Sequence, residues 1–195
     1  MPEKYSQNIT IMNVGDNIFN SRMATLVNTV NCVGIMGKGL AKEFKKHFPE
    51  MYDDYKKRCE REEVKPGIPY FWKNSTNGKS VLNFPTKRHW RGDSRFEWIE
   101  SGLKKFVQNY RGWGIDSIAF PALGCSNGGL EWQSIEPLML KNLQPLRDIT
   151  IEIYPPSSSP APVTNKVLKD KRLKNGPRHE VSLFTTASHL RDEDS

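Results

Sequence analysis

Two glycine-rich segments, residues 34–39 and 124–129, constrain the fold of this chain more than any other feature. Each follows a β-branched or apolar run typical of a strand, at 25–30 or 115–122, and precedes a run with helical periodicity. Loops after the strands of an α/β sheet carry ligands, and glycine lets backbone N–H groups approach a phosphate. One such loop could be an ordinary turn, but two favour ligand binding. They hold six of the 14 glycines: Gly34, Gly37, Gly39, Gly124, Gly128 and Gly129.

Strands and helices are expected to alternate along the chain. Short β-branched or aromatic runs predict strands at 9–14, 25–30, 68–72, 80–84, 115–122 and 149–154. Apolar residues at three- and four-residue steps predict helices at 40–48 and 96–110. A proline at the first turn predicts a helix at 49–61, and another helix is predicted at 130–143. This order predicts an α/β sandwich around a parallel or mixed sheet. The first glycine segment has neither the spacing of a Walker loop nor the third glycine of a dinucleotide fingerprint.

Aromatic side chains are expected mainly in the core. Trp132 would cover either the core or one wall of a ligand cleft. Along 96–110 an apolar stripe with helical spacing is predicted to be core, namely Phe96, Ile99, Leu103, Phe106 and Tyr110.

The chain is basic, with 29 Lys and Arg against 22 Asp and Glu and a net charge of +7. A positive balance favours polyanionic partners such as nucleic acid. No run approaches the ~20 apolar residues of a membrane span, and the first residues lack the apolar run of a signal peptide. We therefore expect no membrane contact and a cytoplasmic location, or a nuclear one in a eukaryote.

The three cysteines have no metal-binding spacing, so reduced thiols and no metal site are expected. Cys32 and Cys125 are interpreted as small buried packing residues.

Composition also divides the chain: residues 1–155 form the predicted domain. Residues 156–195, rich in proline, serine and charge, form a predicted disordered tail.

Polar residues beside the predicted strand ends are candidates for a binding site. Asp16 and Asn17 follow the first strand, and Asn28 and Asn31 lie at the end of the second. Asparagine is depleted in strands, so these side chains either hydrogen-bond a turn or face a sugar hydroxyl. The basic run 87–91 is either a solvated loop or a nucleic-acid contact, in which arginine pairs with phosphate and an aromatic ring stacks on a base.

Three separated segments resemble the macrodomain family. They are GD at 15–16 with VNTVN at 27–31 and GIMGKGLA at 34–41, then NFPTKRHWRG at 83–92, then PALGCSNGGLEW at 121–132. The middle segment is similar to the DarG-type branch, the antitoxin macrodomains that remove ADP-ribose from DNA. The resemblance covers about residues 8–155 and implies a three-layer α/β/α sandwich with a mixed central sheet.

The resemblance implies positions for an ADP-ribose ligand. Asp16 would accept a hydrogen bond from the adenine amino group, and the two glycine loops would hold the diphosphate. Asn31 would contact the distal ribose, with Asn28 supporting either the strand end or the sugar. The implied ADP-ribose-binding residues are Asp16, Asn17, Asn28, Asn31, Gly34, Met36, Gly37, Lys38, Gly39, Leu123, Gly124, Cys125, Ser126, Asn127, Gly128, Gly129 and Leu130.

Lys87 is the implied catalytic residue. It would act at the anomeric carbon, either as a neutral amine that forms a transient imine or as an ammonium that stabilises the leaving base. Arg88 and Arg91 are expected to lower its pKa by like-charge repulsion. A related human glycohydrolase has an acidic residue where Gly128 lies here, so its lysine–aspartate pair is not carried over. The residues expected to bind DNA are Arg88, His89, Trp90 and Arg91.

The implied function is hydrolysis that removes mono-ADP-ribose from a nucleobase of single-stranded DNA. No cofactor or metal is expected, because ADP-ribose is ligand and product. The expected partners are ADP-ribosylated DNA or another ADP-ribosylated substrate and a toxin ADP-ribosyltransferase, with the chain itself a monomer.

Two alternative functions stay open. One is a hydrolase of other ADP-ribose derivatives, such as modified protein, O-acyl-ADP-ribose or ADP-ribose 1″-phosphate. The other is a non-catalytic ADP-ribose-binding module.

Overall fold

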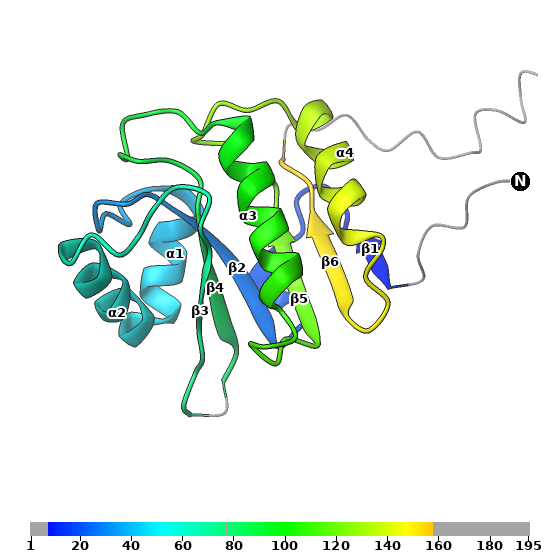
Figure 1. The fold of residues 1–195 in the computed structure, drawn as a ribbon, viewed down its shortest axis with the longest axis horizontal. Coiled ribbons are helices and arrows are strands. Elements are labelled where there is room, and N and C mark those ends of the chain that lie inside the picture. The colour runs from blue at the N-terminus through cyan, green and yellow to red at the C-terminus, as the bar shows by residue number, and fades with distance from the viewer. Residues whose placement is uncertain (1–7, 77, 158–195) are drawn as a thin grey trace, which may run out of the picture. The chain divides into compact units, whose positions relative to one another are not determined.

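The computed structural model describes residues 8–76 and 78–157, which form one six-stranded sheet (Figure 1). The strand order is β1-β6-β5-β2-β4-β3. All neighbours pair in parallel except β3, which runs antiparallel to β4. The mixed sheet is therefore confirmed. The strands are β1 (Ile9–Ile11), β2 (Thr25–Val30), β3 (Tyr70–Trp72), β4 (Ser80–Pro85), β5 (Ser117–Pro121) and β6 (Thr150–Tyr154).

All four predicted helices are present, with ends within two residues of the predicted ones. They are α1 (Gly39–His47), α2 (Pro49–Glu60), α3 (Phe96–Asn109) and α4 (Trp132–Leu143). A 3₁₀ turn, η1 (Ile18–Asn20), was not predicted. The Asn17 side chain caps it by accepting the Phe19 N–H at 3.0 Å. Asparagine is a preferred N-cap because its oxygen satisfies an N–H that the helix leaves unpaired.

Two apolar clusters pack against opposite faces of the sheet. Alternation along β2 separates them, since Val27 joins one cluster and Leu26 and Val30 join the other. The first cluster includes the buried residues of α3 and α4, and the second those of α1 and α2. In Figure 1, α1 and α2 lie together at one side of the view, away from α3 and α4. The three-layer α/β/α architecture is thus confirmed.

Helix α3 buries most of its predicted apolar stripe. Ile99, Leu103, Phe106 and Tyr110 are all at most 1% exposed. The expectation for Phe96 was wrong, because its side chain is 40% exposed. Phe96 is the first residue of the helix, one turn before Ile99, the first residue of the stripe to be buried.

Of the two places expected for Trp132, the structure favours the core. The side chain packs in the cluster beneath α3 and α4. The predicted tail, apart from residues 156 and 157, lies outside the described residues. Within the described part of the chain, no helix is both long enough and apolar enough to cross a bilayer.

Candidate active site

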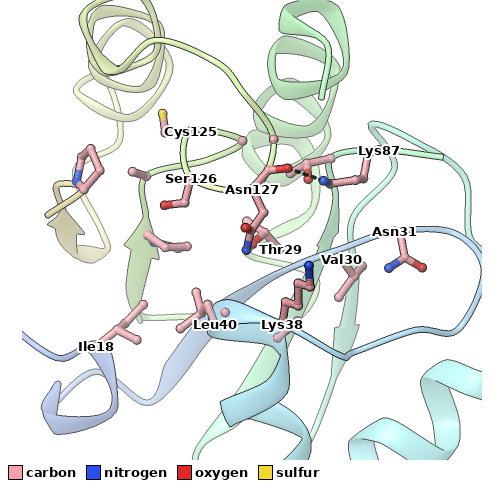
Figure 2. Close-up of a pocket in the computed structure, with 18 of the residues that line it drawn as sticks. Ile18, Thr29, Val30, Asn31, Lys38, Leu40, Lys87, Cys125, Ser126 and Asn127 are labelled. Carbon is pink, nitrogen blue, oxygen red and sulfur yellow. Dashed lines mark hydrogen bonds between the residues drawn. The ribbon is translucent and has the colours of Figure 1, made fainter. Parts of the chain in front are cut away.

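A cavity of about 630 Å³ lies where β2, β4, β5 and β6 end, between the two glycine loops. This volume is typical of sites for small molecules and cofactors. Figure 2 shows Ile18 and Leu40 on one side of it and Lys87 and Asn127 on another. The cavity is therefore built at the carboxyl ends of parallel strands, as expected for this class of sheet.

Asn31 organises the first glycine loop. Its Oδ1 accepts hydrogen bonds from the N–H of Val33 at 3.0 Å, from that of Ile35 at 3.4 Å and from the Tyr55 hydroxyl at 2.9 Å. Its Nδ2 donates to the Ile35 carbonyl at 2.6 Å. Asn31 also lines the cavity. It therefore holds the turn, one of the two roles considered for it, while facing the site.

Asn28 lies inside the sheet rather than in the cavity. The side chain is fully buried, and its Nδ2 donates to Asn83 Oδ1 at 3.0 Å. These two asparagines stand opposite each other in the β2–β4 pair. Asn28 is not among the residues that line the cavity. The structure therefore places it where it supports the strand end.

The second glycine loop is folded tightly around Gly128. A Cβ atom added there would lie only 2.3 Å from both the Gly124 carbonyl oxygen and Ser94 Oγ. Two backbone bonds close the loop: Leu130 N–H to Gly124 O at 3.0 Å, and Ser94 N–H to Gly128 O at 2.9 Å. A side chain at position 128 would therefore require the loop backbone to move.

Lys87 lies just after β4 and is only 9% exposed. Its Nζ donates to the Asn127 carbonyl at 2.5 Å and so bridges to the second glycine loop (Figure 2). Burial lowers the pKa of Lys87, because a desolvated ammonium is disfavoured, and the nearby Asp93 carboxylate partly opposes this effect. The expected cause was wrong: burial, and not repulsion from Arg88 and Arg91, lowers this pKa.

Residues near both ends of the described chain form another part of the cavity lining. Asp16, Asn17 and Ile18 line it together with residues 154–157. Asp16 is exposed, and one of its oxygens, Oδ2, accepts the Asn13 N–H at 3.0 Å. Its Oδ1 has no partner among the described residues, so the carboxylate has an acceptor available for a ligand.

The basic run after β4 divides into two groups. Trp90 and Arg91 line the cavity, whereas Arg88 and His89 do not. The Arg91 guanidinium lies 4.5 Å from the centre of the Trp90 ring, and His89 stacks on the same ring at 5.4 Å. Arg88 instead approaches the Trp98 ring, at 5.9 Å.

The two loop cysteines are half-buried, so they are less enclosed than expected. Burial raises the pKa of Cys32 to about 11 and that of Cys125 to about 12. At neutral pH both are thiols, and a thiol is a poor nucleophile. Within residues 8–76 and 78–157, no three His, Cys, Asp or Glu side chains converge to hold a metal ion.

Fourteen of the implied site residues line the cavity, and eight do not. The lining residues are Asp16, Asn17, Asn31, Gly37, Lys38, Gly39, Lys87, Trp90, Arg91, Gly124, Cys125, Ser126, Asn127 and Gly128. The others are Asn28, Gly34, Met36, Arg88, His89, Leu123, Gly129 and Leu130.

Sequence reasoning missed further lining residues, most of them apolar or small. They are Ile18, Thr29, Val30, Ile35, Leu40, Ala41, Thr86, Pro121, Ala122, Tyr154, Pro155, Pro156 and Ser157. The rule that ligands lie at strand ends would have found Thr86, Pro121 and Tyr154.

The sequence is similar to a known protein family and to curated proteins of known name. The family model described as Macro domain matches residues 27–139. A curated protein from Mycobacterium tuberculosis, named DNA ADP-ribosyl glycohydrolase, is 45% identical over 134 residues, which cover 68% of this chain and 38% of that protein. A Thermosipho africanus protein, named DNA ADP-ribosyl transferase-DNA ADP-ribosyl glycohydrolase fusion protein, is 42% identical over 170 residues, covering 78% and 43%.

A solved structure shares the fold at similar identity. It is described as Thermosipho africanus DarTG in complex with ADP-ribose, and matches with a TM-score of 0.75 and 42% identity over 82% of this chain and 44% of that one. The chain thus spans about two fifths of the length of each of these relatives.

Proposed function

This chain belongs to the macrodomain family, and from that premise we propose that it is a hydrolase that removes mono-ADP-ribose from a nucleobase of single-stranded DNA. The observation that carries the proposal is the placement of Lys87: a largely buried amine that lines the cavity together with Trp90 and Arg91. The names of the relatives, DNA ADP-ribosyl glycohydrolase among them, support the same activity.

ADP-ribose would lie along the cavity with its two ends in different surroundings. The free oxygen of Asp16 would accept a hydrogen bond from the adenine amino group, and the glycine loops would bind the diphosphate through backbone N–H groups. Asn31 and Lys87 would then adjoin the distal ribose. The ADP-ribose complex of the Thermosipho relative supports this choice of ligand. We expect no cofactor beyond the ligand itself.

Lys87 would act as the nucleophile. As a neutral amine, its Nζ would bond to C1″ of the ribose while the bond from C1″ to the base nitrogen breaks. The proton that the newly bonded Nζ loses would pass to the departing base. Breaking of the C1″–O4″ bond, with a proton from water going to O4″, would open the sugar ring and give an iminium. Water adding at C1″ would then break the C1″–Nζ bond, return the proton to solvent, and release ADP-ribose and the free lysine. Burial lowers the Lys87 pKa and so supports the amine over the ammonium.

A partner follows from the same proposal. An enzyme that removes ADP-ribose from DNA acts after one that attaches it, and the Thermosipho relative is named as a fusion of both activities. We therefore expect an ADP-ribosyltransferase toxin to work with this chain, which itself would act as a monomer.

One experiment separates this function from its alternatives. Wild-type chain is incubated with an ADP-ribosylated single-stranded oligonucleotide and with an ADP-ribosylated protein, and release of free ADP-ribose is followed. We expect the wild-type chain to release ADP-ribose from DNA. Lys87→Met should release it at least about 100-fold more slowly, the usual scale for removing a catalytic group. Calorimetry should give nearly unchanged affinity for free ADP-ribose, because the lost interaction belongs to the transition state.

Lys38→Met is the matched control. Lys38 also lines the cavity, but on the first glycine loop. Its loss should weaken ADP-ribose binding and leave turnover at saturating substrate largely intact. If Lys87→Met released ADP-ribose from DNA at the wild-type rate, Lys87 would have no catalytic role. Faster release from protein than from DNA would favour the alternative hydrolase, and binding without release would favour the binding module.

A further inference from the structure

Three arginines in the segment between β4 and α3 make no ion pair. Arg88, Arg91 and Arg95 have no carboxylate within 4.0 Å in the described part of the chain, whereas other arginine side chains are held at 2.6–2.7 Å from one. Those paired arginines are Arg58, Arg61 and Arg111. A local cluster of unpaired guanidinium groups is the charge pattern that binds phosphates.

Two of these arginines share one aromatic ring outside the cavity. The guanidinium carbons of Arg88 and Arg95 lie 5.9 and 4.9 Å from the centre of the Trp98 ring. Stacking on an indole orients a guanidinium while leaving its N–H donors free. Two like charges held over one ring repel each other, so an anion bound there would relieve the repulsion.

The group formed by Arg88, Arg95 and Trp98 lies on the same stretch of chain as residues that line the cavity. Trp90 and Arg91 line the cavity, and Arg88 lies on the same segment, where its carbonyl accepts the Cys32 N–H at 3.0 Å. Trp98 follows in the first turn of α3. The segment therefore carries one arginine–tryptophan group at the cavity and a second one beyond it.

We propose that Arg88, Arg95 and Trp98 form a binding site for single-stranded DNA that holds nucleotides flanking the modified one. The inference rests on the proposed function for its choice of substrate. The two guanidinium groups bind backbone phosphates, and the indole offers a face on which an unpaired base stacks. Such a site binds an unmodified strand as well, independently of ADP-ribose.

The test measures binding of the 195-residue chain to a fluorescent, unmodified single-stranded oligonucleotide by anisotropy at several salt concentrations. Arg88→Gln with Arg95→Gln should weaken binding several-fold. The slope of log affinity against log salt should fall by about 1.4, the value for two phosphate contacts on a single strand. Trp98→Phe keeps an aromatic ring and should bind like wild type. Trp98→Leu should weaken binding, because it removes the ring on which a base stacks and over which both guanidinium groups lie.

The control is Lys105→Gln with Lys141→Gln, which removes the same charge from two exposed lysines of α3 and α4. The proposal is overturned if the arginine variant loses no more affinity than this control, or if duplex DNA of the same sequence binds as tightly as the single strand. Thermal denaturation of every variant checks that the fold is retained.

A second measurement separates this proposal from the proposed function. With ADP-ribosylated oligonucleotides of increasing length, wild-type KM should fall as flanking nucleotides are added, and the arginine variant should lose that gain at unchanged kcat. If wild type releases ADP-ribose from DNA and length has no effect on KM, the flanking site is wrong and the function stands. If no DNA is hydrolysed but the arginine variant still loses oligonucleotide binding, the function is wrong and the site stands.

Discussion

The protonation state of Lys87 decides which chemistry the cavity can perform. Burial favours the neutral form, and the Asn127 carbonyl is positioned to accept one of the amine hydrogens. If the amine attacks, the rate of ADP-ribose release should rise with pH and level off above the lowered pKa. If an ammonium protonates the leaving base, the rate should fall over the same range. Single-turnover rates from about pH 6 to about pH 10 distinguish the two.

Cys125→Ser is a suitable control for this profile. Cys125 also lines the cavity, but its pKa, which burial raises to about 12, keeps it protonated across the measured range. We therefore expect the variant to follow the wild-type pH profile. A profile that is flat in the wild type would contradict any role for proton transfer at Lys87 in the rate-limiting step.

Single residues also mark how far sequence reasoning could go. Asn28 and Asn31 look equivalent in the sequence, three residues apart at one strand end. Their environments differ because Asn28 meets Asn83 in the register of β2 with β4, whereas Asn31 meets Tyr55 of α2. Neither partner lies nearby in the sequence, so a local pattern could not assign the two roles.

At the scale of the loops, the two glycine segments should respond differently to a methyl group. A Cβ at Gly37 would contact only Ile35 Cγ2, at 3.7 Å, although Gly37 lines the cavity. Gly37→Ala should therefore keep the wild-type melting temperature and weaken ADP-ribose binding, because the methyl group occupies space near the phosphates. Calorimetry and thermal denaturation measure the two effects separately.

Gly128→Ala should disturb the loop itself. Its Cβ would overlap the Gly124 carbonyl, which is backbone and cannot rotate away. We expect a melting temperature lower by several degrees, corresponding to roughly 1–3 kcal/mol, the usual cost of overpacking, together with lost binding. Gly112→Ala, at an exposed site where the nearest atom is 3.4 Å away, should change neither. Stable, fully binding Gly128→Ala protein would contradict the observed loop geometry.

Helices and strands were predictable because their signals are local. Periodicity located α1 and α3, a β-branched run located β2, and an apolar run located β5. The turn η1 was missed because three residues carry no periodic pattern, and its cap depends on a single asparagine. The 87–91 run was correctly placed after a strand, but its arginines diverge toward Trp90 and Trp98, which the run itself could not indicate.

For the molecule as a whole, the alternation of elements predicted three layers but not the order of the strands. Pairing of β1 with β6 joins segments about 140 residues apart. The same region is closed by the Ser21 hydroxyl, which donates to Glu152 at 2.6 Å. This long-range pairing brings residues 16–18 into one cavity with residues 154–157. Sequence patterns within one segment contain no information on such contacts.

The same pairing gives a prediction for the boundary of the domain. Pro156 and Ser157 line the cavity, although the predicted boundary assigns them to the tail. A chain that ends after residue 157 should keep the melting temperature and ADP-ribose affinity of the 195-residue chain, because the omitted segment is rich in proline, serine and charge and offers little apolar surface to bury. A chain that ends after residue 155 should melt at the same temperature, since β6 ends at Tyr154, and should bind ADP-ribose more weakly. Calorimetry and thermal denaturation of the two truncated chains test this directly. Equal affinities would show that Pro156 and Ser157 do not contact the ligand, and a lower melting temperature for the longer one would place the domain boundary further along the chain.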